Sequence, residues 1–123
     1  MTTRILVVDD MPVIRHSVRF NLEKEADFVV CGEAENGKVA IEQVEELRPD
    51  VVVLDLSMPV MNGMDAARAI KAIAPRVHIL MYTLHTSPEL IEEARKVGVA
   101  DVLSKVDTGG SRVRDAVRSL VPV

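Results

Sequence analysis

Aromatic residues and cysteines are nearly absent from this sequence. Its 123 residues include one Tyr, two Phe and no Trp, whereas 48% of them are hydrophobic. A core is therefore expected to consist of aliphatic side chains and Met, and the chain length suits one domain with little room for a second. The single cysteine, Cys31, excludes an internal disulfide and is typical of a reducing compartment. We expect Cys31 to be a buried, inert thiol.

The chain also lacks an excess of basic residues and any long apolar run. Fifteen Lys and Arg residues against nineteen Asp and Glu residues give a net charge of −4. Domains that bind nucleic acid usually present a basic face, so this class of function is not indicated. No apolar run approaches the roughly 18 residues that cross a bilayer, and residues 1–4 do not resemble a signal peptide. We expect a cytoplasmic protein that binds neither nucleic acid nor a membrane.

Five short apolar runs, most of them rich in β-branched residues, predict β-strands. The runs are continuous rather than alternating, which is typical of strands covered on both faces of a parallel sheet. They span residues 5–8, 28–31, 51–54, 77–82 and 99–103. The second and fifth runs are weaker and shorter, as edge strands often are.

Segments with helical periodicity lie between these runs and after the last one. In the first, Ile14, Val18 and Leu22 share one stripe, and Arg15 and Arg19 lie off it. Strands that alternate with helices predict an α/β fold, a doubly wound five-stranded parallel sheet with right-handed crossovers. The common order for five strands is 2-1-3-4-5, the flavodoxin-like arrangement. We expect one domain over residues 1–123, with residues 108–110 as a flexible loop.

Acidic residues follow the first and third predicted strands. Asp9 and Asp10 end the first strand, and Asp55 ends the third. In open α/β sheets, ligands bind outside the carboxyl ends of the strands at the switch point, which lies here between strands one and three. Three carboxylates at one place repel each other unless a counter-charge is present. Because Mg2+ prefers carboxylate and phosphate oxygens, the sequence predicts a Mg2+ site at this edge.

A hydroxyl and an amine follow the next two strands. Thr83 ends the fourth strand, and Lys105 comes directly after the fifth. Each feature alone has an ordinary explanation, since a paired Asp often caps a helix and a lone Lys often lies on the surface. Together, the acids, metal ion, hydroxyl and amine suit the binding of a phosphoryl group, and the prediction depends on all of them lying at one edge.

At these residues the chain resembles the receiver domains of bacterial two-component response regulators. The resemblance covers nearly the whole chain, and the third and fourth strand segments resemble the subfamily usually linked to helix-turn-helix output domains. The residues that carry it are Ile5-Leu6-Val7-Val8-Asp9-Asp10, Asp55-Leu56-Ser57-Met58-Pro59, Asn62-Gly63, Thr83 and Lys105.

The resemblance implies a role for each acidic residue. Asp55 would accept a phosphoryl group from a phosphohistidine of a sensor histidine kinase and form an acyl phosphate. Asp10, Asp55 and the backbone carbonyl of Ser57 would ligate Mg2+, and Asp9 would support the ion through water. The domain would promote only its own phosphorylation and dephosphorylation, and would not be an enzyme for outside substrates.

The resemblance also implies how a signal leaves the site. Lys105 and Thr83 would contact phosphoryl oxygens, and the loop 84–87 would rearrange when Thr83 moves toward Asp55. The surface from the fourth helix to the last would then change. The first helix would face the kinase, and the last helix would meet an output domain or a second copy in a homodimer.

The chain departs from the family pattern at three positions. Val102 stands where an aromatic residue is common, Val106 where proline is common, and Leu84 where a small residue is common. A cis bond before a non-proline residue costs about 2.5–4 kcal/mol, so we expect a trans bond at Val106 and an altered loop around Gly109 and Gly110. Tyr82 is not expected to replace the missing aromatic, because adjacent strand residues point to opposite faces.

Three other functions agree less well with the residues. A flavin-binding domain of this topology would need a phosphate-binding loop of small residues after the first strand, where residues 9–12 carry two acids. An aspartate-based phosphatase would need a second acid beside Asp55 as general acid, and the next two residues provide none. The remaining alternative is a pseudo-receiver that binds partners without being phosphorylated, with which the three departures agree.

Overall fold

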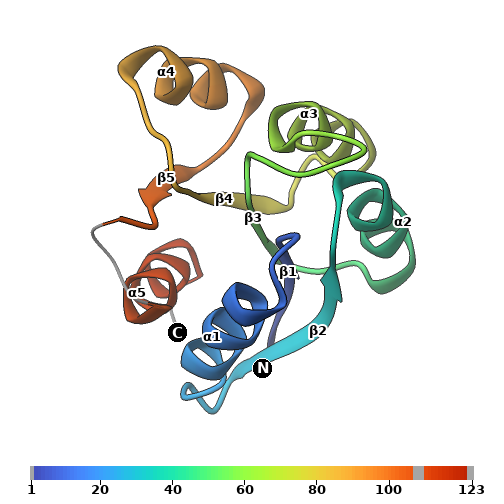
Figure 1. Cartoon of the computed structure of the whole chain (residues 1–123). Helices are drawn as coiled ribbons and strands as arrows, with labels where there is room; N and C mark the ends of the chain where they lie inside the picture. Colours follow the sequence, from blue (N-terminus) through green and yellow to red (C-terminus); the bar gives the residue numbers. More distant parts are fainter. Residues whose placement is uncertain (1, 107–109, 122–123) are drawn as a thin grey trace.

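The computed structural model describes residues 2–106 and 110–121. These residues form a five-stranded sheet in the order β2-β1-β3-β4-β5, with all neighbouring strands parallel. The flavodoxin-like order predicted from the sequence is confirmed (Figure 1). The elements, in chain order, are β1 (Thr3–Val8), α1 (Pro12–Leu22), β2 (Phe28–Ala34), α2 (Gly37–Leu47), β3 (Val51–Leu54), α3 (Gly63–Ile73), β4 (His78–Thr83), α4 (Pro88–Val97), β5 (Asp101–Ser104) and α5 (Gly110–Leu120).

The strand β2 is longer than the sequence predicts. It extends for seven residues to Ala34 and pairs with β1 along its whole length, from Thr3 opposite Phe28 to Val8 opposite Ala34. The predicted edge position is confirmed, but the predicted short length was wrong, because Gly32 and Glu33 interrupt the apolar run without ending the ladder. The register of the two strands shifts by one residue at Cys31. The Cys31 side chain is only half-buried, and this burial raises the pKa of its thiol.

Local signals in the sequence explain where the helices begin and end. The side chains of Asn36, Asn62 and Ser87 each accept a hydrogen bond from a backbone N–H in the first turn of α2, α3 and α4. Such caps satisfy donors that have no partner within the helix. At the end of α4, Gly98 adopts φ 105°, a left-handed conformation that glycine tolerates best.

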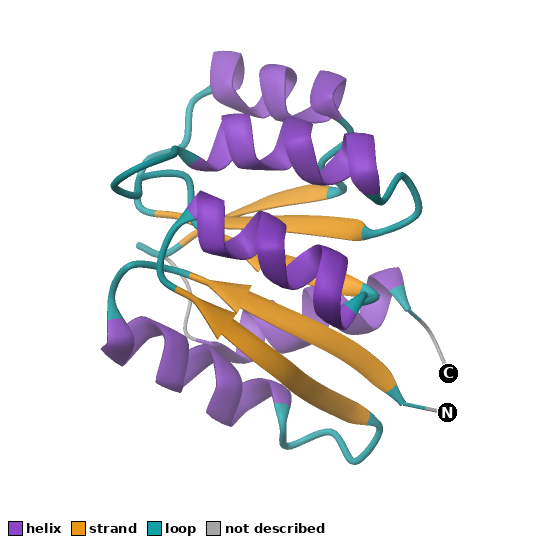
Figure 2. Cartoon of the chain, turned by 90° about the vertical axis from the view of Figure 1, so that its right-hand side faces the viewer, coloured by secondary structure: helices purple, strands orange, loops and turns teal. Residues whose placement is uncertain are grey.

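Helices cover both faces of the sheet, as Figures 1 and 2 show. One apolar layer joins β1, β3 and β4 to α2, α3 and α4, and includes Leu6, Leu54 and Met81. The second layer joins the other face of these strands to α1 and α5, and includes Ile5 and Tyr82. Burial on both faces explains why the strand runs are continuous rather than alternating. Within the described residues, no helix has the length and apolar character needed to span a membrane.

The loop between β5 and α5 is only partly described. Lys105 and Val106 are described, and because cis peptide bonds are absent from the described chain, the predicted trans bond is confirmed. The predicted loop 108–110 lies outside the described residues except for Gly110, which is the first residue of α5. The expectation that Gly109 absorbs a change in this loop therefore stays a prediction.

Candidate functional site

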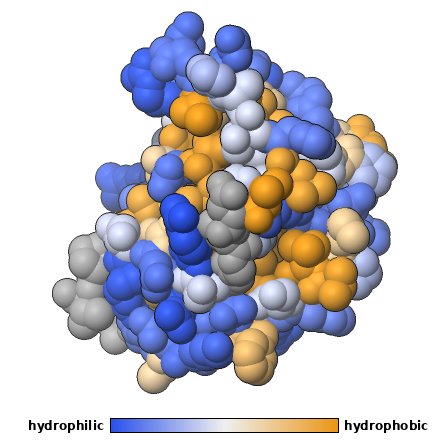
Figure 3. All heavy atoms as spheres, turned by 60° about the vertical axis from the view of Figure 1, so that its left-hand side comes forward, coloured by the Kyte–Doolittle hydropathy of each residue, from blue (hydrophilic) through white to orange (hydrophobic). Residues whose placement is uncertain are grey.

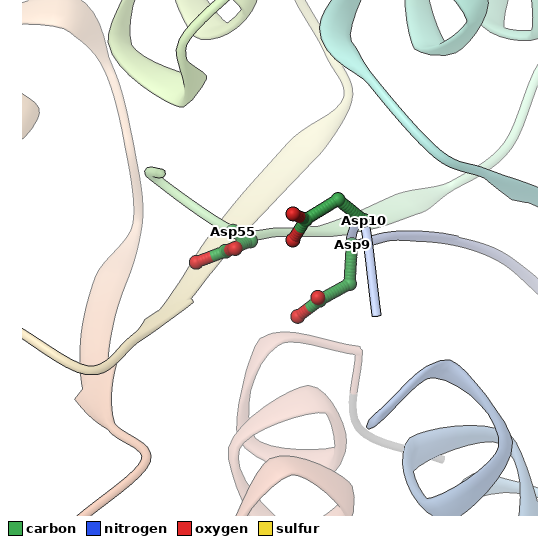
Figure 4. A group of neighbouring side chains, drawn as sticks. All are labelled: Asp9, Asp10 and Asp55. Carbon is green, nitrogen blue, oxygen red and sulfur yellow. The ribbon is translucent and has the colours of Figure 1, made fainter. Parts of the chain in front are cut away.

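The parallel pairing of β1 with β3 brings three acidic residues together at the carboxyl edge of the sheet. Val8 lies opposite Leu54, and the backbone N–H of Asp55 donates to the Val8 oxygen at 3.0 Å. Asp9, Asp10 and Asp55 therefore lie side by side at the ends of these strands. One carboxylate oxygen from each lies within 4.8 Å of the others (Figure 4). Asp9 and Asp55 are buried, whereas Asp10 is exposed.

Lys105 reaches into this cluster from the end of β5. Its Nζ lies 2.5 Å from Oδ2 of Asp9 and 3.5 Å from Oδ1 of Asp55. All three side chains are no more than 7% exposed, so little water screens their charges. Burial raises the pKa of Asp55 and the nearby Asp9 raises it further, while Lys105 acts in the opposite direction. One ammonium group thus faces two buried carboxylates and a third at the surface, which leaves the cluster negative.

The two oxygens of Asp9 are both engaged, whereas Asp10 is available. Oδ1 of Asp9 accepts a hydrogen bond from the Met11 backbone N–H at 3.0 Å, and Oδ2 pairs with Lys105. The Asp10 side chain takes part in none of the hydrogen bonds or ion pairs found among the described residues. Asp10 is therefore the acid of the cluster that is free to bind a ligand without first losing a partner.

Thr83 ends β4, the strand next to β3, with a buried hydroxyl. The residue is 1% exposed, and its Oγ1 has no hydrogen-bond partner within the described part of the chain. A buried polar atom without a partner costs free energy and calls for an explanation such as a missing ligand. The backbone oxygen of Thr83 accepts from the N–H of Lys105 at 2.8 Å, which ties this strand end to the lysine.

Ser57 is exposed in the loop after β3, two residues beyond Asp55. Its backbone N–H favours the ionised form of the Asp55 carboxyl, although burial and Asp9 outweigh this influence on the pKa. Ser57 and Asp10 line the same hollow of about 690 Å³ beside the acidic cluster. The hollow gives a ligand access to Asp10 from the side of α3 and α4.

Gly63 is a site residue to which the sequence assigned no role beyond its part in the family resemblance. A Cβ atom at this position would lie 2.2 Å from the backbone oxygen of Asp55 and 2.7 Å from the Leu56 Cα. The loop between β3 and α3 therefore folds back against the residue that follows β3. The Asn62-Gly63 pair was the available signal, but only the path of the backbone reveals the close approach.

The residues at which the chain departs from the family pattern form no hydrogen bond or ion pair with the three acids of the cluster in the described part of the chain. Leu84 is 53% exposed, and Val102 packs against the apolar layer of α2, α3 and α4. Tyr82 belongs to the opposite layer, as predicted from strand alternation, and its ring centroid lies 5.6 Å from the Nζ of Lys105. Tyr82 therefore contacts the lysine of the site rather than the hydroxyl of Thr83.

One arginine of α1 and one of α5 make contacts within the chain that the sequence did not predict. Arg15, expected to lie off the packed face, donates to the Asp9 backbone oxygen at 2.6 Å. Arg118 of α5 pairs with Asp27 at 2.6 Å and with Glu25 at 3.4 Å, so it is engaged within the chain. The apolar stripes indicated neither contact, because Arg15 reaches a backbone oxygen six residues before it, and Arg118 reaches Asp27, 91 residues before it.

Another cavity lies at the opposite edge of the sheet. It has a volume of about 1010 Å³ and is lined by segments that precede the strands, including residues 48–50 and 73–78. None of the predicted site residues lines it. The acidic cluster is thus separate from this cavity.

The fold and the site together define an open α/β domain with an acidic pocket, bordered by a lysine, at the switch point of its strand order. A family model, the response regulator receiver domain, matches residues 5–117 of this chain. The chain belongs to this family and contains a receiver domain of two-component signalling. The resemblance stated from the sequence is thereby confirmed.

Curated relatives include proteins of different lengths. The chemotaxis protein CheY of Thermotoga maritima is 38% identical over 105 residues, which cover 85% of this chain and 87% of that protein. The response regulator protein VraR of Staphylococcus aureus is 35% identical over 118 residues, 96% of this chain and 56% of that protein. A protein-glutamate methylesterase/protein-glutamine glutaminase of Idiomarina loihiensis is 42% identical over 123 residues, 98% of this chain but 32% of that protein. The chain thus spans about a third of the methylesterase and just over half of VraR.

Solved structures of receiver domains share the fold of this chain. The chemotaxis protein CheY4 of Vibrio cholerae matches with a TM-score of 0.89 and 29% identity, covering 98% of this chain and 100% of that one. The response regulator domain of Thermotoga maritima CheB matches with a TM-score of 0.86 and 29% identity, covering 98% and 93%. The arrangement of strands and helices is therefore shared with receiver domains of several regulators.

Proposed function

We propose that Asp55 accepts a phosphoryl group from a phosphohistidine of a sensor histidine kinase, in a reaction that depends on Mg2+. The observation that carries this proposal is the burial of Asp55 between two further acids and the Nζ of Lys105, 3.5 Å from its carboxylate. A buried acid surrounded in this way has no evident structural purpose, since an apolar side chain would pack at lower cost.

The acidic cluster fits a small divalent cation. It offers oxygen donors from Asp9, Asp10 and Asp55, close enough together to share one ion, and Mg2+ prefers such donors together with water and phosphate oxygens. Asp10, Asp55 and the Ser57 carbonyl would hold the ion, and Asp9 would support it. When bound, Mg2+ supplies positive charge next to the phosphoryl oxygens.

The side chains of the chain would carry out the transfer itself. A carboxylate oxygen of Asp55 forms the new bond to phosphorus, while the bond from phosphorus to the histidine nitrogen breaks and the nitrogen keeps the electron pair. Charge then spreads over the three remaining phosphoryl oxygens. Lys105, 3.5 Å from Asp55, would neutralise one of them, and the Thr83 hydroxyl, which has no partner among the described residues, would donate to another.

The signal would leave through the loop that follows Thr83. Because Thr83 ends β4, a shift of its side chain toward the phosphoryl group would be transmitted to residues 84–87 and to α4. Figure 3 shows apolar groups among charged ones on the side of α4, β5 and α5, where Leu84, Ile91 and Val106 are exposed. This surface would meet an output domain or a second copy. An unchanged backbone over residues 84–87 in a phosphate-mimic complex would contradict this route.

Labelling with a small acyl phosphate tests the proposal. The chain is incubated with acetyl phosphate and Mg2+, and its intact mass is measured. We expect the wild type to gain one phosphoryl group, and we expect neither the Asp55→Asn variant nor a sample with the metal chelated to gain it.

Two results would contradict the proposal in different ways. Labelling of the Asp55→Asn variant would mean that another residue accepts the phosphoryl group. A wild type that neither gains mass nor binds Mg2+ in a titration would indicate the alternative function, a pseudo-receiver that binds partners without being phosphorylated.

A further inference from the structure

Arg15 links the acidic cluster to the neighbouring edge strand β2. Its side chain is 17% exposed, which is unusual for an arginine near the start of a surface helix. Nη1 donates to the Asp9 backbone oxygen at 2.6 Å, and Nε donates to Oε1 of Glu33 on β2 at 3.1 Å. One guanidinium group thus joins the turn after β1, the helix α1 and the strand β2.

The bond to the Asp9 oxygen completes the hydrogen bonding of that residue. The Asp9 N–H donates to the Ala34 oxygen at 3.0 Å, and its two carboxylate oxygens are held by Met11 and Lys105. The backbone oxygen is the remaining polar atom, and it belongs to the peptide group that joins Asp9 to Asp10. Because a peptide group is planar, a fixed oxygen fixes the direction in which the chain enters Asp10.

Asp10 depends on this peptide more than the other two acids do. Its side chain is exposed and has no hydrogen bond or ion pair among the described residues, so the backbone, which sets the direction of its Cα–Cβ bond, is the one constraint found on the reach of its carboxylate. A free rotation of the Asp9–Asp10 peptide would move the carboxylate away from the shared position near Asp55.

Glu33 holds Arg15 in the required orientation. Burial opposes the ionisation of Glu33, but hydrogen bonds from Arg19 and Arg15 outweigh it, so its pKa lies below the usual range. The backbone oxygen of Glu33 also accepts from Gln43 at 2.9 Å, which ties this part of β2 to α2. Since a guanidinium group donates in several fixed directions, it can bond to Glu33 and to Asp9 at once, which an ammonium group does less well.

We propose that Arg15 is a positioning residue, which holds the Asp9–Asp10 peptide so that the Asp10 carboxylate is placed for a divalent cation, with Glu33 orienting Arg15. This inference rests on the proposed function, because it assigns Arg15 a part in the Mg2+ site.

Arg19 is a matched control on the same helix. It carries the same charge one turn later, and its Nη1 lies 3.0 Å from Oε2 of Glu33. No hydrogen bond joins it to Asp9 in the described part of the chain. The Arg19→Met variant therefore removes the same charge and a bond to the same Glu33, but leaves the Asp9 oxygen bonded.

Whether Arg15→Met weakens or strengthens Mg2+ binding distinguishes a positioning role of Arg15 from the effect of its charge. Removing a positive charge near three acids makes the cluster more negative, which strengthens the binding of a cation. Losing the position of the Asp10 carboxylate weakens the binding of a cation. Weaker Mg2+ binding in Arg15→Met therefore cannot result from the lost charge.

The experiment measures the Mg2+ dissociation constant of the whole chain by calorimetric titration. Substitutions of residues that orient metal ligands typically cost about 10- to 100-fold in metal affinity, and we expect about a tenfold rise for Arg15→Met. We expect a smaller rise for Arg15→Lys and for Glu33→Gln, and no weakening for Arg19→Met. With acetyl phosphate, Arg15→Met should need more Mg2+ for half-maximal labelling but reach the wild-type maximum rate, which a merely unfolded fraction would not do.

The outcomes distinguish the two proposals. If the wild type binds Mg2+ and is labelled but Arg15→Met binds Mg2+ as tightly as the wild type, the role of Arg15 is wrong and the proposed function stands. Equal weakening of Mg2+ binding in Arg15→Met and Arg19→Met would also overturn the proposed role of Arg15. If Arg15→Met does not fold, Arg15→Lys decides, because it keeps the positive charge, and unchanged affinity in that variant overturns the proposal. A wild type without Mg2+ binding overturns both.

Discussion

The path of the loop after β3 depends on the absence of a side chain at Gly63. The atoms that a Cβ would meet are backbone atoms of Asp55 and Leu56, which cannot rotate out of the way. The N–H of Gly63 also donates to the Leu56 oxygen at 2.7 Å, so the two segments are held together. At the scale of single residues, Gly63 thus fixes the backbone that presents Asp55.

The Gly63→Ala variant should lose stability and activity together. Inserting a methyl group into a packed place costs typically about 1–3 kcal/mol, and we expect the free energy of unfolding to fall by about the upper end of that range, as measured with denaturant. Phosphoryl labelling of Asp55 should slow, because the loop must shift.

Gly37→Ala serves as the control for this prediction. A Cβ at Gly37 would meet the Cβ atoms of Ala66 and Met61 and the Met61 Cγ at 3.0–3.1 Å, so these neighbours need to give by only a few tenths of an ångström. We expect a clearly smaller loss of stability there. Equal losses in the two variants would mean that the contact with the Asp55 backbone has no special weight.

At the scale of elements, α5 is attached to the rest of the molecule by an arginine as well as by apolar packing. Arg118 bonds to both carboxylate oxygens of Asp27, at 2.6 and 2.9 Å, and its guanidinium lies 4.3 Å from the Phe28 ring centroid. Val113 and Val117 of the same helix are fully buried. The arginine therefore connects α5 to the turn between α1 and β2.

The contribution of Arg118 should depend on pH. Its hydrogen bond is the main cause that lowers the pKa of Asp27 in the folded protein, so the stabilisation is complete above the ordinary Asp pKa of about 4. It is lost as the pH falls through the lower, folded value. We expect Arg118→Met to unfold at a lower temperature than the wild type at pH 7, and the difference to shrink below about pH 4.

Arg95 provides the comparison for this pH dependence. It pairs at 2.6 Å with Glu92 of its own helix, on the surface, and so joins no two elements. Arg95→Met should change the unfolding temperature little at pH 7, because exposed pairs within one helix contribute little. A pH-independent difference for Arg118→Met would mean that the ion pair with Asp27 is not what holds α5.

The sequence predicts the elements well where one local pattern decides them. Continuous apolar runs and the alternation of strands with helices lead to the observed sheet order, and Asn36, Asn62 and Ser87 mark the helix starts. The length of β2 could not be predicted in this way, because pairing with β1 carries the strand across Gly32 and Glu33.

The same limit applies to the site. Asp9, Asp55 and Lys105 could be brought together from the sequence because the carboxyl ends of parallel strands share one edge. Arg15 and Gly63 could not, since their contacts depend on the reach of a side chain and on the path of a loop. Helical periodicity reports only which face of α1 is apolar, and Arg15 turns from beside that face toward the Asp9 oxygen.

At the scale of the whole molecule, a two-layer apolar core supports a cluster of like charges at one edge. The fully buried Leu6, Leu54 and Ile70 illustrate how completely the core is packed. Against this, three acids share one place with a single lysine. A site arranged for binding commonly lowers the stability of the empty protein, so a change that abolishes binding can make the fold more stable.

The Asp10→Asn variant should separate these two effects. Without Mg2+, the loss of one like charge should raise the free energy of unfolding by about 0.5–2 kcal/mol. Adding Mg2+ at about 100 times its dissociation constant should stabilise the wild type by roughly 2.7 kcal/mol and the variant much less, so the order of stability reverses. Thermal unfolding with and without Mg2+ measures both.

Glu46→Gln, which removes an exposed acid of α2 outside the cluster, should leave both values near those of the wild type. If Asp10→Asn is stabilised by Mg2+ as strongly as the wild type, Asp10 does not hold the ion.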